Sequence, residues 1–382
     1  MLVIKGGHGL GVGLADVLVD NGSIAGIGAF DAPEVLDASG LVVLPGFVDT
    51  HRHLVQAAMR GTGADLPLST YLAEVLPRMG TLSEADVRAA VLLGAVEALN
   101  AGVTTVLDWG HVGDPAVAHE ALSASGIRAV FGVDPDQAHR FASLRGLVTG
   151  AIASLGPSYL SLEDSARHFE VARSLGLLTS MHVTGAGVVS RLAAADLLGP
   201  GLHFVHGNGL TDEELKLLVE AGCGFTVTPV VESMMGHGFP AYGRFLAAGG
   251  APALGVDVVI NSTPDLFEQM RSALRLERVH GASLQAGSLL RSATLDGARA
   301  IGLGDSVGSL EVGKRADLVL LDNFAHLPAH LLAGGIVATG GVADVRTVLV
   351  DGRIVKRDGV LVDHDLSSLR AAVTSAARRV LA

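Results

Sequence analysis

The first candidates for chemistry in this chain are two histidines one residue apart, His51 and His53. An apolar run, residues 41–44, leads toward them, as expected for a buried strand. Because side chains alternate between the two faces of a strand, both imidazoles point the same way and Arg52 points to the other side. Two imidazoles on one face at the end of a strand can bind a metal together. The alternative is two histidines that only hydrogen-bond to their neighbours.

Further side chains able to bind a metal follow other strand-like segments of the chain. Taken singly, each is more simply a strand-end residue with a satisfied hydrogen bond. Their repetition at corresponding places in successive units favours a shared metal site, since the C-terminal ends of parallel strands meet on one face of a barrel. These residues are Asp108, His111, His182, His206 and Asp257.

Three neutral imidazoles and one carboxylate suit a borderline divalent ion such as Zn²⁺, with one position left open for water. The ion would lower the pKa of this water towards about 7. A nearby carboxylate could accept the proton, and a further imidazole could hold the hydroxide or polarise a substrate.

The elements that must position these residues alternate along the middle of the chain. Strand-like segments are expected at residues 103–108, 127–133, 178–182, 203–206, 224–228 and 253–257, with helical patterns between them. This alternation predicts a (β/α)8 barrel over residues 47–310; an open, doubly wound sheet is the alternative. Short segments at residues 65–79 and 236–250 are expected to be loops around an open site.

Both ends of the chain have the pattern of short antiparallel strands. Asn21-Gly22 and Asp351-Gly352 each separate two apolar strand-like runs, which predicts two hairpins. We therefore expect residues 1–46 and 311–382 to form one small β domain around the inserted barrel.

The composition is that of a globular protein with a large core. The 382 residues are 49% hydrophobic and carry a formal net charge of −12, without a basic block. Nucleic acid and acidic membrane surfaces are therefore not expected partners, and a small-molecule substrate is; a homodimer is left open. The uncharged stretch 327–343 is broken by glycines and is expected to form a loop and short buried segments, not a membrane span. The single cysteine, Cys223, excludes an internal disulfide and favours a cytoplasmic location.

Several motifs together resemble the amidohydrolase superfamily. The resemblance is to its branch of aminohydrolases and chlorohydrolases, which includes relatives acting on cytosine, triazines and thioadenosine or adenosylhomocysteine. It covers nearly the whole chain and rests on residues 45–53 (PGFVDTHRH), 101–108 (AGVTTVLD), 205–206, 210–214, 254–257 (LGVD), 293–300 and 308–319.

This resemblance implies a (β/α)8 barrel with a small β-sandwich built from both termini. It implies one metal ion, usually zinc and sometimes iron, bound by His51, His53, His182 and Asp257. His206 would orient the water or the substrate, and Asp257 would also act as general base. The implied activity is hydrolysis of a carbon–nitrogen bond, by deamination of a heterocyclic or aromatic amine or by opening of a cyclic amidine or amide.

One departure from the family pattern concerns proton delivery. Deaminases of this branch usually carry a glutamate three residues after the strand-five histidine, where this chain has Gly185. Glu232 is the best substitute for this acid, or else a structural carboxylate bonded to backbone. Without the glutamate, dechlorination or a non-hydrolytic reaction on the same metal is the alternative function, and an inactive binding homologue is a third.

Four further residues are expected to touch the substrate. His237, between two glycines, is a candidate substrate contact or a surface-loop histidine. Trp109 and His111 follow the second barrel strand and are expected to line the pocket; a core position is the alternative for Trp109. Gln56 follows the histidine pair, where a helical turn could present it to the site.

Overall fold

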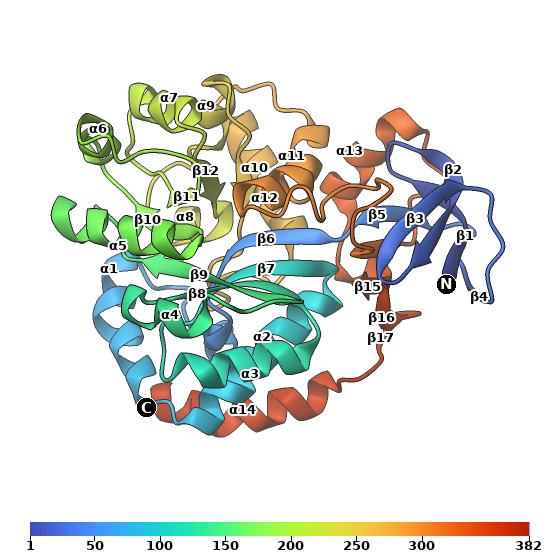
Figure 1. Cartoon of the computed structure of the whole chain (residues 1–382), viewed down its shortest axis with the longest axis horizontal. Helices are drawn as coiled ribbons and strands as arrows, with labels where there is room; N and C mark the ends of the chain where they lie inside the picture. Colours follow the sequence, from blue (N-terminus) through green and yellow to red (C-terminus); the bar gives the residue numbers. More distant parts are fainter. Residues whose placement is uncertain (382) are drawn as a thin grey trace.

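A computed structural model describes residues 1–381, in which a barrel and a second sheet lie side by side (Figure 1). Within these residues the barrel has eight parallel strands that follow one another around the ring in chain order. A bridge between Arg52 and Asp257 joins the two ends of this sheet. The predicted (β/α)8 barrel is therefore confirmed, and the open doubly wound sheet is excluded. The strands are β6 (Phe47–Arg52), β7 (Val103–Trp109), β8 (Arg128–Val133), β9 (Val148–Ser154), β10 (Thr179–Val183), β11 (Leu202–His206), β12 (Gly224–Val227) and β13 (Ala253–Leu254).

The strand β9 is the barrel strand that sequence analysis missed. Its residues include Gly150, Ala151 and Ala153, which have low strand propensity, so the local pattern is weak. Packing between β8 and β10 overrides this preference, and residues 151–154 are buried. Pairing with the neighbouring strands, rather than local propensity, therefore makes this segment a strand.

Helices cover the outside of the barrel between the strands. Two of them, α2 and α7, begin at capping boxes in which Ser83 and Thr211 accept hydrogen bonds from backbone N–H groups of the first turn. The principal helices are α2 (Glu84–Asn100), α3 (Pro115–Ser125), α5 (Leu162–Leu175), α6 (Val188–Ala194), α7 (Asp212–Glu220), α10 (Leu266–Val279), α11 (Ala286–Ser292) and α12 (Leu295–Ala300).

The segment between β6 and α2 is helical rather than a loop. After the 3₁₀ turns of η1 (Leu54–Met59), the chain forms α1 (Leu68–Thr70), η2 (Tyr71–Val75) and η3 (Leu76–Thr81). The expected loop at residues 65–79 is thus wrong, because Tyr71, Val75 and Met79 are buried at helical spacing. The segment 236–250 also contains a helix, α9 (Tyr242–Ala247).

The second sheet is built from both ends of the chain and is mostly antiparallel. Both expected hairpins are present, and at the first of them Asn21 and Gly22 adopt the positive φ angles of 47° and 77° that its turn requires. In order across the sheet the strands are β17 (Val360–Leu361), β16 (Arg353–Arg357), β15 (Val345–Val350), β14 (Leu318–Leu321), β5 (Val42–Pro45), β1 (Leu2–Gly9), β2 (Gly13–Asp20) and β3 (Ser23–Gly28), with β4 (Glu34–Asp37) also on β1.

A buried ion pair joins the barrel to this sheet. The Arg128 guanidinium at the start of β8 donates to both carboxylate oxygens of Asp317, at 2.7 and 3.0 Å. It also reaches Asp351 at 2.9 Å, in the turn between β15 and β16. The division of the chain into domains at residues 46 and 310 stays a prediction.

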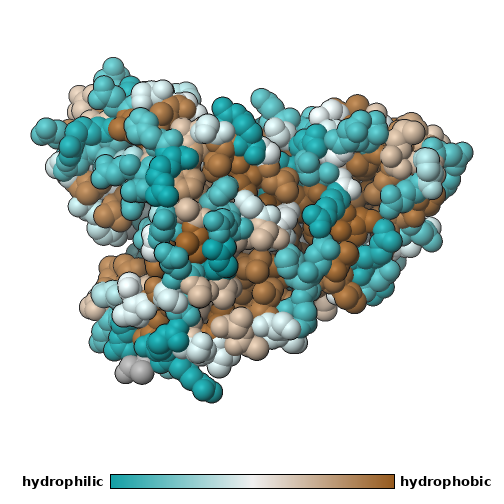
Figure 2. Space-filling view, turned by 60° about the horizontal axis from the view of Figure 1, so that its bottom comes forward, coloured by the Kyte–Doolittle hydropathy of each residue, from teal (hydrophilic) through white to brown (hydrophobic). Residues whose placement is uncertain are grey.

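The stretch 327–343 differs from its expectation of a loop with short buried segments. It contains α13 (Ala329–Thr339), in which Leu332, Ile336 and Val337 face the core. Among residues 1–381, no helix combines the length and the apolar character needed to cross a membrane. On the face shown in Figure 2, hydrophobic side chains reach the surface between hydrophilic ones.

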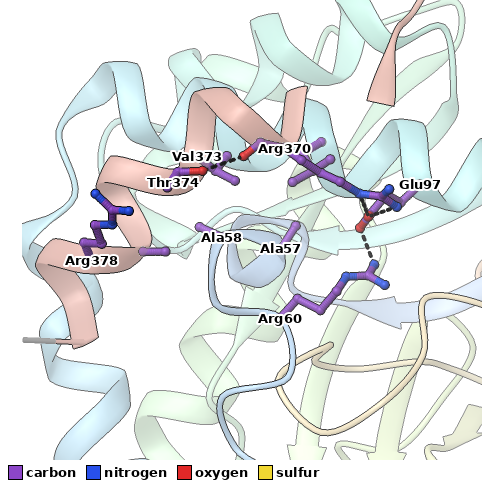
Figure 3. Close-up of a pocket in the computed structure, with 10 residues that line it drawn as sticks. Ala57, Ala58, Arg60, Glu97, Arg370, Val373, Thr374 and Arg378 are labelled. Carbon is purple, nitrogen blue, oxygen red and sulfur yellow. Dashed lines mark hydrogen bonds and ion pairs between the residues drawn. The ribbon is translucent and has the colours of Figure 1, made fainter. Parts of the chain in front are cut away.

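The C-terminal helix α14 (Leu366–Leu381) lies along the barrel, next to α2 and η1 (Figure 1). Its anchor is Glu97 of α2, whose side chain is 3% exposed and accepts hydrogen bonds from Arg370 at 3.1 and 3.3 Å. Arg60 binds the same carboxylate from the end of η1 (Figure 3). One buried carboxylate therefore ties together three segments that are far apart in the sequence.

We expect Glu97→Gln to lower the free energy of unfolding by about 1–2 kcal/mol, because the guanidinium groups of Arg60 and Arg370 lose the carboxylate that they share. Urea unfolding at pH 7 measures this change. The matched control is Glu120→Gln, which breaks an exposed ion pair with Arg88 and should cost less than about 0.5 kcal/mol. Equal effects of both variants would contradict the anchoring role of Glu97.

Candidate active site

The first barrel strand, β6, positions the two histidines as the alternation of side chains predicts. Arg52 points away from them, is fully buried, and binds Asp49 at 2.8 Å and the carbonyl oxygen of Pro264 at 3.1 Å. Asp49 also accepts a hydrogen bond from the backbone N–H of Val256, at 3.0 Å. Asp49 thus fixes β6 to the segment after β13.

The ligand atoms predicted for a metal ion converge at the C-terminal ends of the strands. Nε2 of His51 lies 3.2 Å from Nε2 of His182 and 3.4 Å from Oδ1 of Asp257. Nε2 of His53 lies 3.3 Å from the same oxygen. Ligands on a tetrahedral zinc ion with bonds of 2.0–2.1 Å are about 3.3 Å apart, so these four residues fit such an ion. Two overlapping groups of three, His51 with His53 and His182 and His51 with His206 and Asp257, each bring their ligand atoms close enough together to hold a metal ion.

The electrostatics of the cluster agree with ligation. Burial, together with the neighbouring imidazoles, holds the pKa of His51, His53 and His182 well below the ordinary value. Neutral imidazole is the form that binds a metal. Three desolvated imidazoles this close together are satisfied jointly by a cation at their centre.

A fourth histidine, His206 at the end of β11, faces the cluster from the side. Its ring stacks on that of His182 at an interplanar angle of 9°, and its Nε2 lies 3.9 Å from Oδ2 of Asp257. Burial disfavours the charged form, but the hydrogen bond to Glu232 and the charge of Asp257 outweigh it and raise the pKa of His206. This histidine is the one best able to carry a proton in the site.

Both His206 and Asp257 adopt unusual backbone conformations, with φ angles of 78° and 65°. Non-glycine residues with positive φ concentrate at functional sites, where the surrounding structure imposes them. At Asp257 the constraint is visible, because its N–H donates to the carbonyl of His51 at 2.8 Å and its carbonyl accepts from the N–H of His53 at 3.0 Å. The side chain of Asp257 is thereby aimed at the cluster.

Glu232 lies behind His206, fully buried in α8 (Pro229–Met234). Its Oε1 accepts hydrogen bonds from the backbone N–H of Thr228 at 2.7 Å and from the hydroxyl of Thr228 at 3.2 Å. The same oxygen is 3.3 Å from Nδ1 of His206. Within residues 1–381, Glu232 does not line the cavity, so it can act on the cavity only through the His206 ring.

The position of the missing glutamate is open space. Gly185 has a φ of +83°, and no atom of the described residues lies within 4 Å of a Cβ placed there. The neighbouring Thr184 lines the cavity with its hydroxyl-bearing side chain instead. Residue 185 therefore contributes no carboxyl group to the site.

A cavity of about 340 Å³ opens above the cluster. His53, His182, His206 and Asp257 form part of its floor, and apolar residues from η2, η3 and the loops form much of its wall. Its size suits a small planar molecule.

Among the predicted substrate contacts, Trp109, His111 and His237 line this cavity and Gln56 does not. The Trp109 ring packs 4.2 Å from that of His182, and its N–H donates to Ser180 at 3.2 Å. Both ring nitrogens of His237 are buried without a hydrogen-bond partner in the described chain. Gln56 is fully buried and donates to the Tyr71 hydroxyl.

Sequence reasoning missed Tyr71, Asp134 and Tyr159 as cavity residues. Asp134 directly follows the expected strand 127–133, and that place could have revealed it. Tyr71 repeats with Val75 and Met79 at a spacing of four residues, a helical signal in the segment that was expected to be a loop, whereas Tyr159 gave no signal.

Comparison with known sequences now identifies the family. Residues 42–355 match the profile described as "Amidohydrolase family". The chain belongs to the amidohydrolase family. It is similar to a 5-methylthioadenosine/S-adenosylhomocysteine deaminase of Desulforudis audaxviator, at 31% identity over 96% of this chain and 95% of the relative. A 5′-deoxyadenosine deaminase of Methanosarcina mazei is 30% identical over 90% of this chain and 88% of that protein.

Solved structures of similar proteins share the fold of this chain. An adenosine deaminase from Xanthomonas campestris with bound zinc superposes with a TM-score of 0.91 at 25% identity, covering 100% of this chain and 98% of that one. Atrazine chlorohydrolase from Arthrobacter aurescens, complexed with zinc, shares the fold at a TM-score of 0.86 and 21% identity, over 99% and 100% of the two chains. This amidohydrolase is thus a metal-dependent hydrolase of carbon–nitrogen bonds.

We expect the protein, purified without chelator, to carry about one equivalent of divalent metal per chain, because four ligand atoms converge at one point. His53→Ala should lose most of it, as measured by elemental analysis. His139→Ala, at an exposed histidine of α4 (Ala138–Phe141), is the control and should keep it. Retention of full metal content by His53→Ala would contradict the ligand assignment.

Proposed function

We propose that this amidohydrolase is a zinc-dependent deaminase of a small heterocyclic amine related to adenosine. The observation that carries the proposal is the convergence of His51, His53, His182 and Asp257 beneath a cavity that His206 also lines. The deaminases of adenosine derivatives that match over nearly the whole chain support the substrate class. Iron in place of zinc and a homodimeric assembly stay predictions.

In the proposed reaction, His51, His53, His182 and Asp257 would hold a divalent ion, which would supply Lewis acidity and lower the pKa of a water molecule towards neutrality. The chain's own residues handle the proton. Asp257 has one oxygen near His53 and the other towards His206, so Oδ2 is placed to accept a proton from the attacking water. His206, polarised by Glu232, holds the water or the developing oxyanion through Nε2.

Protonation of the leaving nitrogen falls to Asp257 in this scheme. With Gly185 in place of the family glutamate, Asp257 and Asp134 are the carboxylates in the described lining of the cavity. Asp257 is the one at the ligand cluster. It would therefore return to the leaving group the proton that it took from water. His237 would hydrogen-bond to the substrate with its unpartnered ring nitrogens.

Dechlorination is the second candidate function. A chloride leaving group needs no proton, and proton delivery is the step for which residue 185 offers no carboxyl group. The same metal cluster and Asp257 would activate the water in both reactions.

We expect the zinc-loaded protein to release ammonia from 5′-methylthioadenosine, and Asp257→Asn to reduce the rate at least about 100-fold by removing the proton acceptor. Coupled ammonia detection measures turnover, and elemental analysis of the same samples confirms metal content. A wild-type rate in Asp257→Asn would refute the base assignment. Chloride release from a chlorotriazine without any ammonia release would favour dechlorination.

Glu232→Gln should lower kcat about 10–100-fold with little change in KM, because the amide keeps the shape but no longer polarises His206. Steady-state kinetics at constant zinc content test this positioning role. Glu232→Ala serves as a second variant that also removes the backbone hydrogen bond. If both variants lose stability but keep wild-type kcat, Glu232 is only a scaffold.

A further inference from the structure

Apart from its histidines and tyrosines, the ionisable side chains described in the cavity lining are carboxylates. In the described part of the chain, no lysine or arginine lines it, whereas two carboxylates, Asp134 and Asp257, do. Asp257 belongs to the ligand cluster, which leaves Asp134 as the carboxylate free to meet another part of the substrate. The whole chain is also acidic, with a formal net charge of −12.

Asp134 stands at the mouth of the cavity, directly after β8 and before η4 (Pro135–Gln137). Within residues 1–381 its carboxylate makes no hydrogen bond or ion pair. Asp114, in contrast, is bound by Arg140 at 3.2 Å. A carboxylate that lines a cavity without a partner in the protein is available to a partner in the ligand.

Large apolar side chains also lie at the mouth. Leu72, Leu155 and Tyr159 line the cavity and are nevertheless 41%, 55% and 53% exposed. Large exposed apolar side chains grouped around a cavity mark a contact surface for a ligand. The part of the substrate farthest from the metal cluster therefore meets hydrophobic side chains and one negative charge.

We propose that this pocket selects substrates by charge: it accepts heterocyclic amines whose distal substituent is neutral or cationic, rejects anionic ones, and uses Asp134 to make the distinction. This inference rests on the proposed function and narrows its substrate class. A phosphate or carboxylate at the mouth would lose its hydration facing a like charge, with no guanidinium or ammonium group to replace the water. An ammonium group there pairs with Asp134.

The test uses the zinc-loaded full chain and three adenosine derivatives that differ at the 5′ position. They are 5′-methylthioadenosine, which is neutral, 5′-amino-5′-deoxyadenosine, which is protonated at pH 7, and adenosine 5′-monophosphate, which is anionic. We measure kcat/KM for ammonia release and, in parallel, equilibrium binding by calorimetry. The variants are Asp134→Asn and, as a matched control, Asp136→Asn, an exposed carboxylate two residues away outside the cavity lining.

For the wild type and Asp136→Asn, we expect the cationic and neutral probes to exceed the anionic one by at least about tenfold, as one close like-charge contact predicts. In Asp134→Asn, kcat/KM for the cationic probe should no longer exceed that for the neutral probe. The value for the anionic probe should lie within about threefold of the neutral one. Circular dichroism and zinc content equal to those of Asp136→Asn show that the Asp134→Asn variant is folded.

The outcomes separate this inference from the function on which it rests. Turnover of all three probes at similar kcat/KM would overturn charge selection and leave the deaminase proposal standing. An unchanged preference in Asp134→Asn would overturn the role of Asp134. Charge-graded binding without ammonia release would support the inference and contradict deamination. Failure of all three probes to bind or react would overturn both.

Discussion

The active site depends on the closure of the barrel between its first and last strands. Backbone hydrogen bonds from Asp257 to His51 and from His53 to Asp257 hold three of the four candidate ligands in one rigid unit. Gly255 makes this contact possible, since a Cβ there would lie 2.9 Å from that of His51 and 3.0 Å from its backbone nitrogen. Any side chain at residue 255 would push the two strands apart and separate Asp257 from the histidines.

Burial affects the charge state of the polar groups around this closure. Asp49 and Arg52 neutralise each other beneath the site and fix β6, while the imidazoles above them are kept neutral by desolvation. His206 differs because Glu232 stands behind it, so a carboxylate outside the cavity lining helps to raise the pKa of an imidazole that lines the cavity.

The ligand cluster and the mouth of the cavity are built by different elements. The ligand cluster sits on strand ends that the barrel makes rigid, whereas the mouth is built by η2, η3 and the segments after β8 and β9. These segments pack through few buried residues and can vary without disturbing the ligands. In this chain they present apolar side chains and Asp134, which together define the chemistry of the distal half of the cavity.

The sequence predicted both hairpins and, with an open sheet as the alternative, the barrel, because turn residues and alternating apolar segments are local patterns. Strand-end residues supplied the candidates for metal ligands, and the resemblance to the amidohydrolases selected His51, His53, His182 and Asp257 among them. Sequence analysis missed β9, whose Gly- and Ala-containing sequence has a weak strand preference, and it took residues 65–79 for a loop. Only the tertiary structure separated Glu232 from the cavity, placed Gln56 behind Tyr71, and brought Asp134 to the mouth. The physical reason is that the direction of a side chain from a helix or loop depends on packing against distant segments, which no local pattern records.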